Sequence, residues 1–252
     1  VRQSADPKGV LLAAYDTRRP TRDVDLQARQ LVSDMGEVLA TVCGIASLEL
    51  DDGLAFDTVS ATASPIREGH VYASTRIWLA ADLASARVVI GVDVNIGDPI
   101  WPPPQRIVLP GLLDRRVELL GYPLSMVYAE KIVTMLERGL VNTRWRDFAD
   151  VYALSDRHSV AAVELRASLE RVAGHRGVEL APLAEALHEF PATAQAKWKT
   201  WHRKQQTAFP VPEDFGDTLT AVTHFADPVL RGQVTVGSWS PTVREWAAVQ
   251  EN

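Results

Sequence analysis

Asp23-Val24-Asp25-Leu26 is the stretch that decides the fold, because it joins a short strand pattern to two carboxylates. Alternate residues of a strand share a face, so the side chains of Asp23 and Asp25 point to the same side. Two carboxylates this close repel each other unless a cation neutralises them, which makes the pair a natural clamp for a divalent metal. The alternative, a solvated strand end or a helix cap, stays open for an isolated Asp-x-Asp.

The segments on both sides of this stretch extend the pattern. Residues 9–15 form an apolar helical run opened by a glycine, and a basic turn with a proline follows at 17–22. Residues 31–43 have the apolar spacing of a helix. Segments rich in Val, Thr, Ala and aromatic residues predict strands at 54–66, 70–80 and 87–94.

The clearest strand is Val88-Val89-Ile90-Gly91-Val92-Asp93-Val94, whose nearly continuous apolar run predicts burial on both faces. Asp93 stands near its end, where a buried charge is costly without a partner. Asp93 alone could equally cap a turn. Three carboxylates gathered on adjacent strands, Asp23, Asp25 and Asp93, would suit two-metal phosphoryl or nucleotidyl transfer.

Prolines mark a change of character in the middle of the chain, at 100–104 and again at 109–111. Beyond them the chain turns helical, and a glycine at position 139 ends the first of the helices. We therefore expect an α/β half followed by a helical half, with the boundary between 100 and 123. The helices are expected at 124–139, 145–154, 160–173, 183–187, 192–206 and 215–226.

Composition sets limits on the class of protein. The 252 residues are 46% hydrophobic and 23% charged, which is typical of a globular chain. The net charge of −6 excludes a generally basic nucleic-acid binder but allows a local basic groove. A single cysteine, Cys43, favours a reducing compartment. With no membrane span and no signal peptide expected, the sequence predicts a cytoplasmic protein. The polar start without Met suggests that residues are missing before Val1 or near Lys8.

Other charged and aromatic residues have a plain interpretation beside the chemical one. Lys131, next to Glu130, is by default a surface lysine. Asp147 and Asp150 could simply start a helix. The stretch 197–204 interleaves cations with Trp198 and Trp201, which favours core packing, with single-stranded RNA binding as the alternative. The sequence has no Walker A motif, no G-x-S-x-G motif and no histidines at metal-ligand spacing.

Several motifs, in order, resemble the AbiEii/AbiGii toxin family of nucleotidyltransferases. The family has a glycine motif followed by D-x-D, and here Gly9 precedes Asp23-Val24-Asp25. The glycine motif is usually Gly-Gly or Gly-Ser, whereas this chain reads Lys8-Gly9-Val10. Further matching segments lie at 92–98, 109–113, 120–123, 129–131 and 142–150, so that the resemblance covers most of residues 8–155.

The resemblance implies an α+β fold, with a polymerase-beta-like nucleotidyltransferase core built on a mixed sheet with helices. The core would occupy residues 1–123, and a mainly helical domain at 124–252 would complete the active-site cleft. Asp23 and Asp25 would be metal ligands, with Asp93 the third carboxylate. Lys131 matches the lysine expected at the nucleotide phosphates, and Asp147 matches the acidic residue of the K/R-D-x-x-D motif. From the residues themselves, Gly9, Arg22 of the basic turn and the hydroxyl of Thr21 are expected to complete the nucleotide site. The alternative for Thr21 and Arg22 is an ordinary solvated turn.

The activity that this family implies is transfer of a nucleoside monophosphate from an NTP, with Mg²⁺ or Mn²⁺. The expected acceptor is RNA, with the tRNA 3′ end as the target, so that translation stops. A cognate antitoxin is the expected partner, and Thr21, on the same side as Asp23, is a position where an antitoxin could act by modification. Two alternatives stay open: transfer to a protein or small-molecule hydroxyl, and a catalytically silent binding module with this fold.

Overall fold

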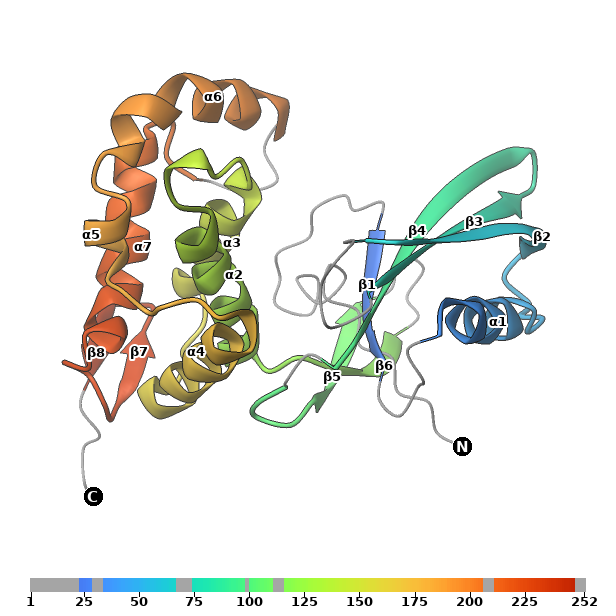
Figure 1. Cartoon of the computed structure of the whole chain (residues 1–252), viewed down its shortest axis with the longest axis horizontal. Helices are drawn as coiled ribbons and strands as arrows, with labels where there is room; N and C mark the ends of the chain where they lie inside the picture. The colour runs from blue at the N-terminus through green and yellow to red at the C-terminus, as the bar shows by residue number, and fades with distance from the viewer. Residues whose placement is uncertain are drawn as a thin grey trace. The chain divides into compact units, whose positions relative to one another are not determined.

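The Asp23 strand forms the edge of a mixed four-stranded sheet in the computed structural model of the chain, which describes residues 23–28, 34–66, 74–97, 100–110, 116–205 and 211–247 (Figure 1). The order is β1-β4-β3-β2. β1 runs parallel to β4, whereas the other neighbours are antiparallel. The strands are β1 (Asp23–Ala28), β2 (Leu54–Pro65), β3 (Thr75–Leu83) and β4 (Ala86–Ile96).

One face of this sheet is apolar and packs against α1 (Met35–Ala46). Val38 of α1 is fully buried with Ile77, Val92 and Val94 of β3 and β4. The helix begins at Asp34, whose carboxylate accepts a hydrogen bond from the backbone N–H of Glu37 at 2.9 Å. Because side chains alternate along a strand, burying these apolar residues turns the residues between them to the opposite face.

The prediction that β4 is buried on both faces holds only for its second half. Gly91 to Val94 are buried, but Val88 and Val89 are 53% and 57% exposed. The reason is the length of the neighbouring strand, since β1 pairs only with the part of β4 from Gly91 to Ile96. The first half of β4 has β3 as its one neighbour in the described sheet and extends past the core.

Two further strands, β5 (Gln105–Pro110) and β6 (Arg116–Gly121), form a separate two-stranded sheet. The sequence predicted only proline breaks here. The strands begin after the cis-proline segment at 101–104, so a break in composition marked the start of an element rather than a loop.

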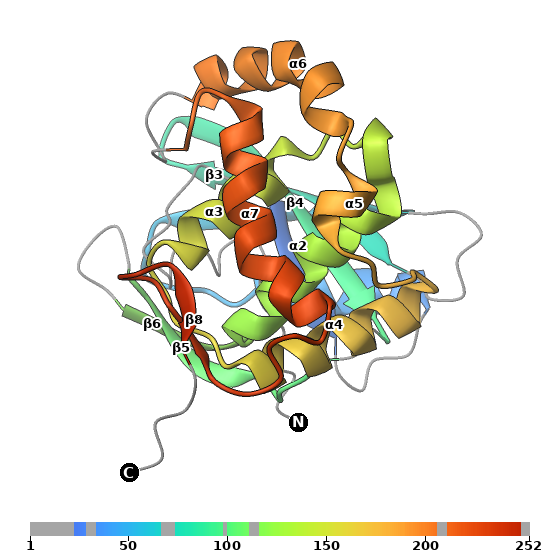
Figure 2. The ribbon, with the colours of Figure 1, turned by 90° about the vertical axis from the view of Figure 1, so that its left-hand side faces the viewer.

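The chain divides into two compact units. Among the described residues, the first holds residues 23–97 and 106–121, and the second holds 100–105 and 122–247. The second unit is helical (Figure 2). Its helices are α2 (Leu124–Arg138), α3 (Trp145–Ser155), α4 (Ala162–Arg176), α5 (Leu183–Ala186), α6 (Phe190–Gln205) and α7 (Phe215–Leu230), with a 3-10 turn η2 (Gly139–Val141) after α2.

Aromatic side chains fill the core of the helical unit. Trp145 stacks on Phe190 with ring centroids 5.7 Å apart, and Phe215 meets the edges of both rings. A short hairpin, β7 (Ser238–Ser240) and β8 (Glu245–Ala247), closes the unit. Its buried Trp239 donates its indole N–H to the carbonyl of Ser155 at 2.6 Å. These contacts fix the ends of α3, which carries Asp147 and Asp150.

The expected elements agree with the structure wherever it describes them. The α+β class with a mixed sheet is confirmed, and so are the six helices expected after residue 123, with shifts of a few residues at their ends. The helix expected at 9–15 lies outside the described residues. None of the described helices is long and apolar enough to cross a membrane.

Candidate active site

The polar face of the four-stranded sheet carries the first group of predicted site residues. Strand pairing sets Asp25 of β1 opposite Asp93 of β4, and Asp93 opposite Arg76 of β3. Residues paired in this way share a face, so the three side chains form a row across three strands. Asp23 pairs with Gly91 one step along, where β4 presents no side chain.

Arg76 holds the carboxylate of Asp93 with two parallel hydrogen bonds. Its Nε donates to Oδ1 and its Nη2 donates to Oδ2, each at 2.6 Å. The Asp93 side chain is only 10% exposed, whereas that of Arg76 is 34% exposed and passes over the ring of Trp78. This fork geometry neutralises the buried carboxylate that the sequence left without a partner.

This face offers ligands that suit a hard divalent cation. Asp25 and Asp93 place carboxylate oxygens side by side on the neighbouring strands β1 and β4. Each Asp93 oxygen uses one acceptor position on Arg76 and keeps another. The backbone of Asp23 lies in β1, but its side chain is outside the described residues. Within the described part of the chain, no group of three or more His, Cys, Asp or Glu side chains is placed to hold a metal ion.

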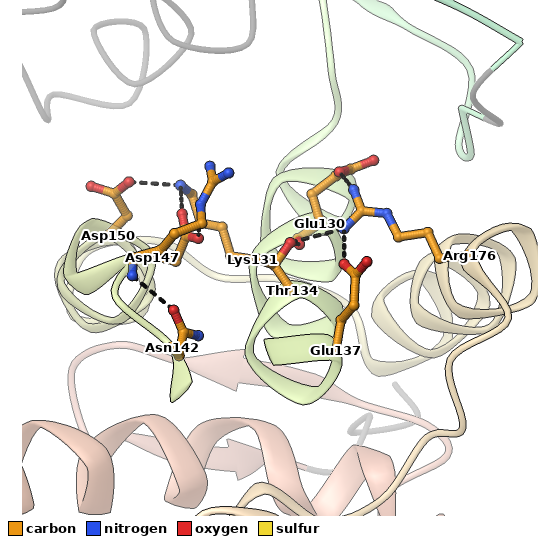
Figure 3. Close-up of polar contacts among 9 residues, drawn as sticks. Glu130, Lys131, Thr134, Glu137, Asn142, Asp147, Asp150 and Arg176 are labelled. Carbon is orange, nitrogen blue, oxygen red and sulfur yellow. Dashed lines mark hydrogen bonds and ion pairs between the residues drawn. The ribbon is translucent and has the colours of Figure 1, made fainter. Parts of the chain in front are cut away.

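The second group of polar residues lies in the helical unit, around Lys131 of α2 (Figure 3). Its ammonium donates to Asp150 Oδ2 at 2.6 Å and to Asp147 Oδ1 at 3.3 Å, both on α3. The side chains of Lys131, Asp147 and Asp150 are 14%, 5% and 1% exposed. The default expectation of a surface lysine is therefore wrong. Lys131 is largely buried because the i, i+3 acids of α3 face it from the neighbouring helix.

The start of α3 places a second cation on Asp147. Arg144 precedes the helix, and its Nε donates to Asp147 Oδ2 at 2.8 Å while its side chain stays 53% exposed. The backbone N–H of Arg144 is in turn fixed by the side-chain oxygen of the buried Asn142, at 2.7 Å. The two oxygens of Asp147 thus each bind a different cation, one buried and one facing solvent.

A separate set of contacts lies on another side of α2, as Figure 3 shows. Arg176 of α4 pairs with Glu130 and donates to the Thr134 hydroxyl at 2.8 Å. Its guanidinium also lies 3.6 Å from Glu137. These contacts bind α4 to α2, so that neighbouring Glu130 and Lys131 serve different helix contacts.

The Lys131 group can do more than pack. A primary ammonium held between carboxylates is a point charge that can transfer from them to the phosphate oxygens of a ligand. The exposed guanidinium of Arg144 adds a planar donor that matches phosphate geometry. The largely buried setting of Lys131 strengthens its own contact.

The predicted site residues fall into three sets. The structure brings Asp25 beside Asp93, and Lys131 beside Asp147, each pair within one unit. Gly9, Thr21 and Arg22 lie outside the described residues. Sequence reasoning did not single out three partners of these residues. Asp150 was visible only as an i, i+3 acid, Arg144 as part of an unremarkable run, and Arg76 as one cation in a strand.

Comparison with known proteins identifies one family. The family described as "Nucleotidyl transferase AbiEii toxin, Type IV TA system" matches residues 9–221, which is most of the chain. No curated protein matches the sequence.

Two solved structures are similar in fold. JHP933 from Helicobacter pylori matches with a TM-score of 0.50 at 10% identity, over 91% of this chain and 84% of that protein. A protein from H. pylori described as a candidate nucleotidyltransferase has a TM-score of 0.48 at 11% identity, over 91% of this chain and 87% of its own. At such low identity the first of these supports the fold alone.

Proposed function

The chain belongs to the AbiEii nucleotidyl transferase toxin family of toxin–antitoxin systems, and we propose that it transfers a nucleoside monophosphate from an NTP to RNA, at the tRNA 3′ end. The observation that carries the proposal is the Lys131 group. The Lys131 side chain is only 14% exposed and binds two acidic residues of the family's K/R-D-x-x-D motif. A charged group held in this way is a candidate for ligand binding.

Asp23 and Asp25 are the proposed metal ligands, with Asp93 as the third carboxylate. Mg²⁺ takes one or two carboxylates together with phosphate oxygens and water, and this set fits that preference. When bound, Mg²⁺ or Mn²⁺ would supply charge neutralisation at the phosphates and at the leaving pyrophosphate. Arg76 holds the Asp93 carboxylate in place with its two 2.6 Å hydrogen bonds. In the proposal, one carboxylate of this face accepts the proton of the attacking hydroxyl.

Lys131 is the proposed contact for the nucleotide phosphates. Asp147 and Asp150 hold its ammonium in one place, so less side-chain entropy is lost when a phosphate arrives. Arg144, through its bond to Asp147, offers a second donor from the solvent side of the same carboxylate. In this proposal the helical domain supplies the contacts to the nucleotide phosphates.

Gly9, Thr21 and Arg22 are proposed to complete the nucleotide site. In the proposal Arg22 adds charge for the phosphates, and Thr21, two residues before Asp23, presents its hydroxyl to them. A phosphate on Thr21 would add about −1.5 to −2 charges beside two carboxylates and repel the NTP. That makes Thr21 the position where a cognate antitoxin would act by modification, in the cytoplasm where translation is blocked.

The test is incubation of the full chain with each labelled NTP, Mg²⁺ or Mn²⁺, and total tRNA. We expect label on RNA that depends on added metal and on Lys131, with Lys199→Ala as the control for loss of one exposed lysine. Sequencing the labelled RNA then gives the acceptor end, and a coupled translation assay measures the block.

Two results would overturn the proposal. Label on protein or on a small molecule, with none on RNA, would establish the alternative acceptor. Absence of any label with every NTP, while Lys131→Ala binds NTP as the parent does, would establish a silent module with this fold.

A further inference from the structure

Helix α6 carries a row of two lysines with a tryptophan between them. Lys197, Trp201 and Lys204 stand at i, i+4 and i+7, so they follow one side of the helix over a rise of about 10.5 Å. Both lysines are exposed, and Trp201 is half-buried. We call these three residues the α6 row. Figures 1 and 2 show α6 lying across one end of α7.

The core contacts the side of α6 that adjoins this row. Trp198 is fully buried and donates its indole N–H to the carbonyl of Pro212 at 3.2 Å. Gln195 ties α6 to the start of α7, because its side-chain oxygen accepts from the backbone N–H of Phe215 at 2.8 Å. The expected packing of the tryptophans is therefore correct for Trp198. Trp201 rests on it, with ring centroids 4.9 Å apart, and keeps part of its surface open.

The charges of the α6 row stand out within an acidic chain. The whole protein has a net charge of −6. On the same helix, Lys199 is neutralised by Glu213 at 3.1 Å. Among the residues that the structure describes, no carboxylate lies within ion-pair distance of Lys197 or Lys204. Two uncompensated cations on one stripe fit a partner with regularly spaced negative charges.

We infer that the α6 row binds single-stranded RNA. The two lysines would contact backbone phosphates, and a base would stack on the open surface of Trp201. An acidic peptide would explain the lysines but would gain nothing from the aromatic ring between them. The inference rests on the proposed function only in that this RNA is the acceptor, so binding and transfer are measured separately.

The experiment uses the full chain and fluorescein-labelled 12-mers: oligo(U), an abasic oligonucleotide of the same length, and an RNA duplex. The variant Lys197→Ala/Lys204→Ala removes the charges of the row. Lys199→Ala/Arg203→Ala is the matched control, with the same charge change on the same helix. Trp201→Ala removes the ring, Trp201→Phe keeps an aromatic face, and thermal melting shows whether each variant is folded.

We expect the row variant to lower the salt dependence of oligo(U) binding by about 1.4 log units per log unit of salt, at about 0.7 for each lost phosphate contact. The control should change it far less. Trp201→Ala should weaken oligo(U) binding about 5-fold or more and leave abasic binding unchanged, with Trp201→Phe between them.

Three results would overturn the inference: equal losses for the two lysine pairs, equal affinity of the parent for oligo(U) and the abasic strand, or stronger binding of poly-glutamate than of oligo(U). Transfer assays separate the two proposals. If the row variant labels RNA with an unchanged KM, the inference fails and the proposed function stands. If the parent labels no RNA but binds oligo(U) through the row, the proposed function fails and the inference stands.

Discussion

The sheet and the helical unit each gather carboxylates, but different forces bring them together. In the sheet, Asp25 and Asp93 lie side by side because strand pairing sets them there, and Arg76 compensates one of them. In the helical unit, Asp147 and Asp150 of α3 meet Lys131 of α2 because two helices pack. In the first arrangement strand register brings the two carboxylates together, whereas in the second a lysine from a neighbouring helix lies between the two carboxylates. From this comparison we propose that the sheet binds the metal and that the helical unit binds phosphate.

Removing a carboxylate from the sheet is the strongest test of the proposed metal binding there. Asp25→Ala, and Asp23→Ala likewise, should lower transfer by about 100-fold or more, since preorganised electrostatic groups are worth that much in a transition state. Stability should hold, because losing one carboxylate relieves repulsion on this face. Label incorporation and circular dichroism measure the two effects.

The matched control is Asp51→Ala, which removes a carboxylate from an exposed turn of the same unit. Loss of activity through unfolding of Asp25→Ala would contradict the metal role. Equal activity of the two variants would also contradict it.

Variants of Lys131 test the proposed phosphate binding by the helical unit. Lys131→Met should cost about 3 kcal/mol of unfolding free energy, because it leaves two nearly buried carboxylates without this cation. Adding Asp150→Asn should restore much of that stability. Transfer and NTP affinity should stay low in the double variant, since the phosphate contact is still missing. Chemical denaturation and NTP titration measure these separately.

Recovery of NTP affinity together with stability in the double variant would assign Lys131 to packing alone. Arg138→Met, which removes a different cation from α2, is the control for the change in side-chain type.

A variant of Arg76 tests whether Asp93 is one of the metal ligands proposed for the sheet. Arg76→Ala should lower stability by about 1 to 2 kcal/mol, because Asp93 loses two charge-assisted hydrogen bonds while it stays largely buried. The freed carboxylate should then favour a cation. We expect added Mn²⁺ to raise the melting temperature of this variant more than that of the parent.

Arg87→Ala is the control for Arg76, because Arg87 pairs with the more exposed Asp57 and Asp82 on the same sheet. If Mn²⁺ does not change the melting temperature of Arg76→Ala, Asp93 is a structural partner of Arg76 and not a metal ligand.

These residues also show how far the sequence reaches. The apolar pattern of β4 was enough to predict a strand there, and the mixed sheet followed from the family resemblance. The shared face of Asp23 and Asp25 stays a prediction. Arg76 could not be predicted as the partner of Asp93, because their pairing depends on the register of an antiparallel hairpin. Lys131 was misjudged for a similar reason. Its burial depends on the packing of α2 against α3, and local spacing carries no information about that contact.

The smallest expected effect concerns a third kind of buried carboxylate, which lies in the helical unit and has backbone partners. Asp227 of α7 is 7% exposed and accepts hydrogen bonds from the backbone N–H groups of Leu183 and Ala184, at 2.7 and 3.0 Å. Burial raises its pKa above the ordinary value of 3.8, despite those two hydrogen bonds. The folded state therefore holds this proton at pH values where the unfolded chain has released it.

The sign of the pH dependence follows from that order. Between 3.8 and the raised pKa the folded state binds more protons, so stability falls as pH rises and then levels off above the folded pKa. Asp227→Asn should remove this slope at a cost of about 1 kcal/mol, since one carbonyl oxygen must replace two carboxylate oxygens. Urea denaturation from pH 3.5 to 7 measures it, with the exposed Asp217→Asn of the same helix as control. An unchanged slope in Asp227→Asn would show that the two backbone donors offset the effect of burial on this pKa. The helical unit would then hold an ionised carboxylate mainly through backbone donors, with Arg231 as the nearby cation, and not through a direct lysine contact as at Lys131.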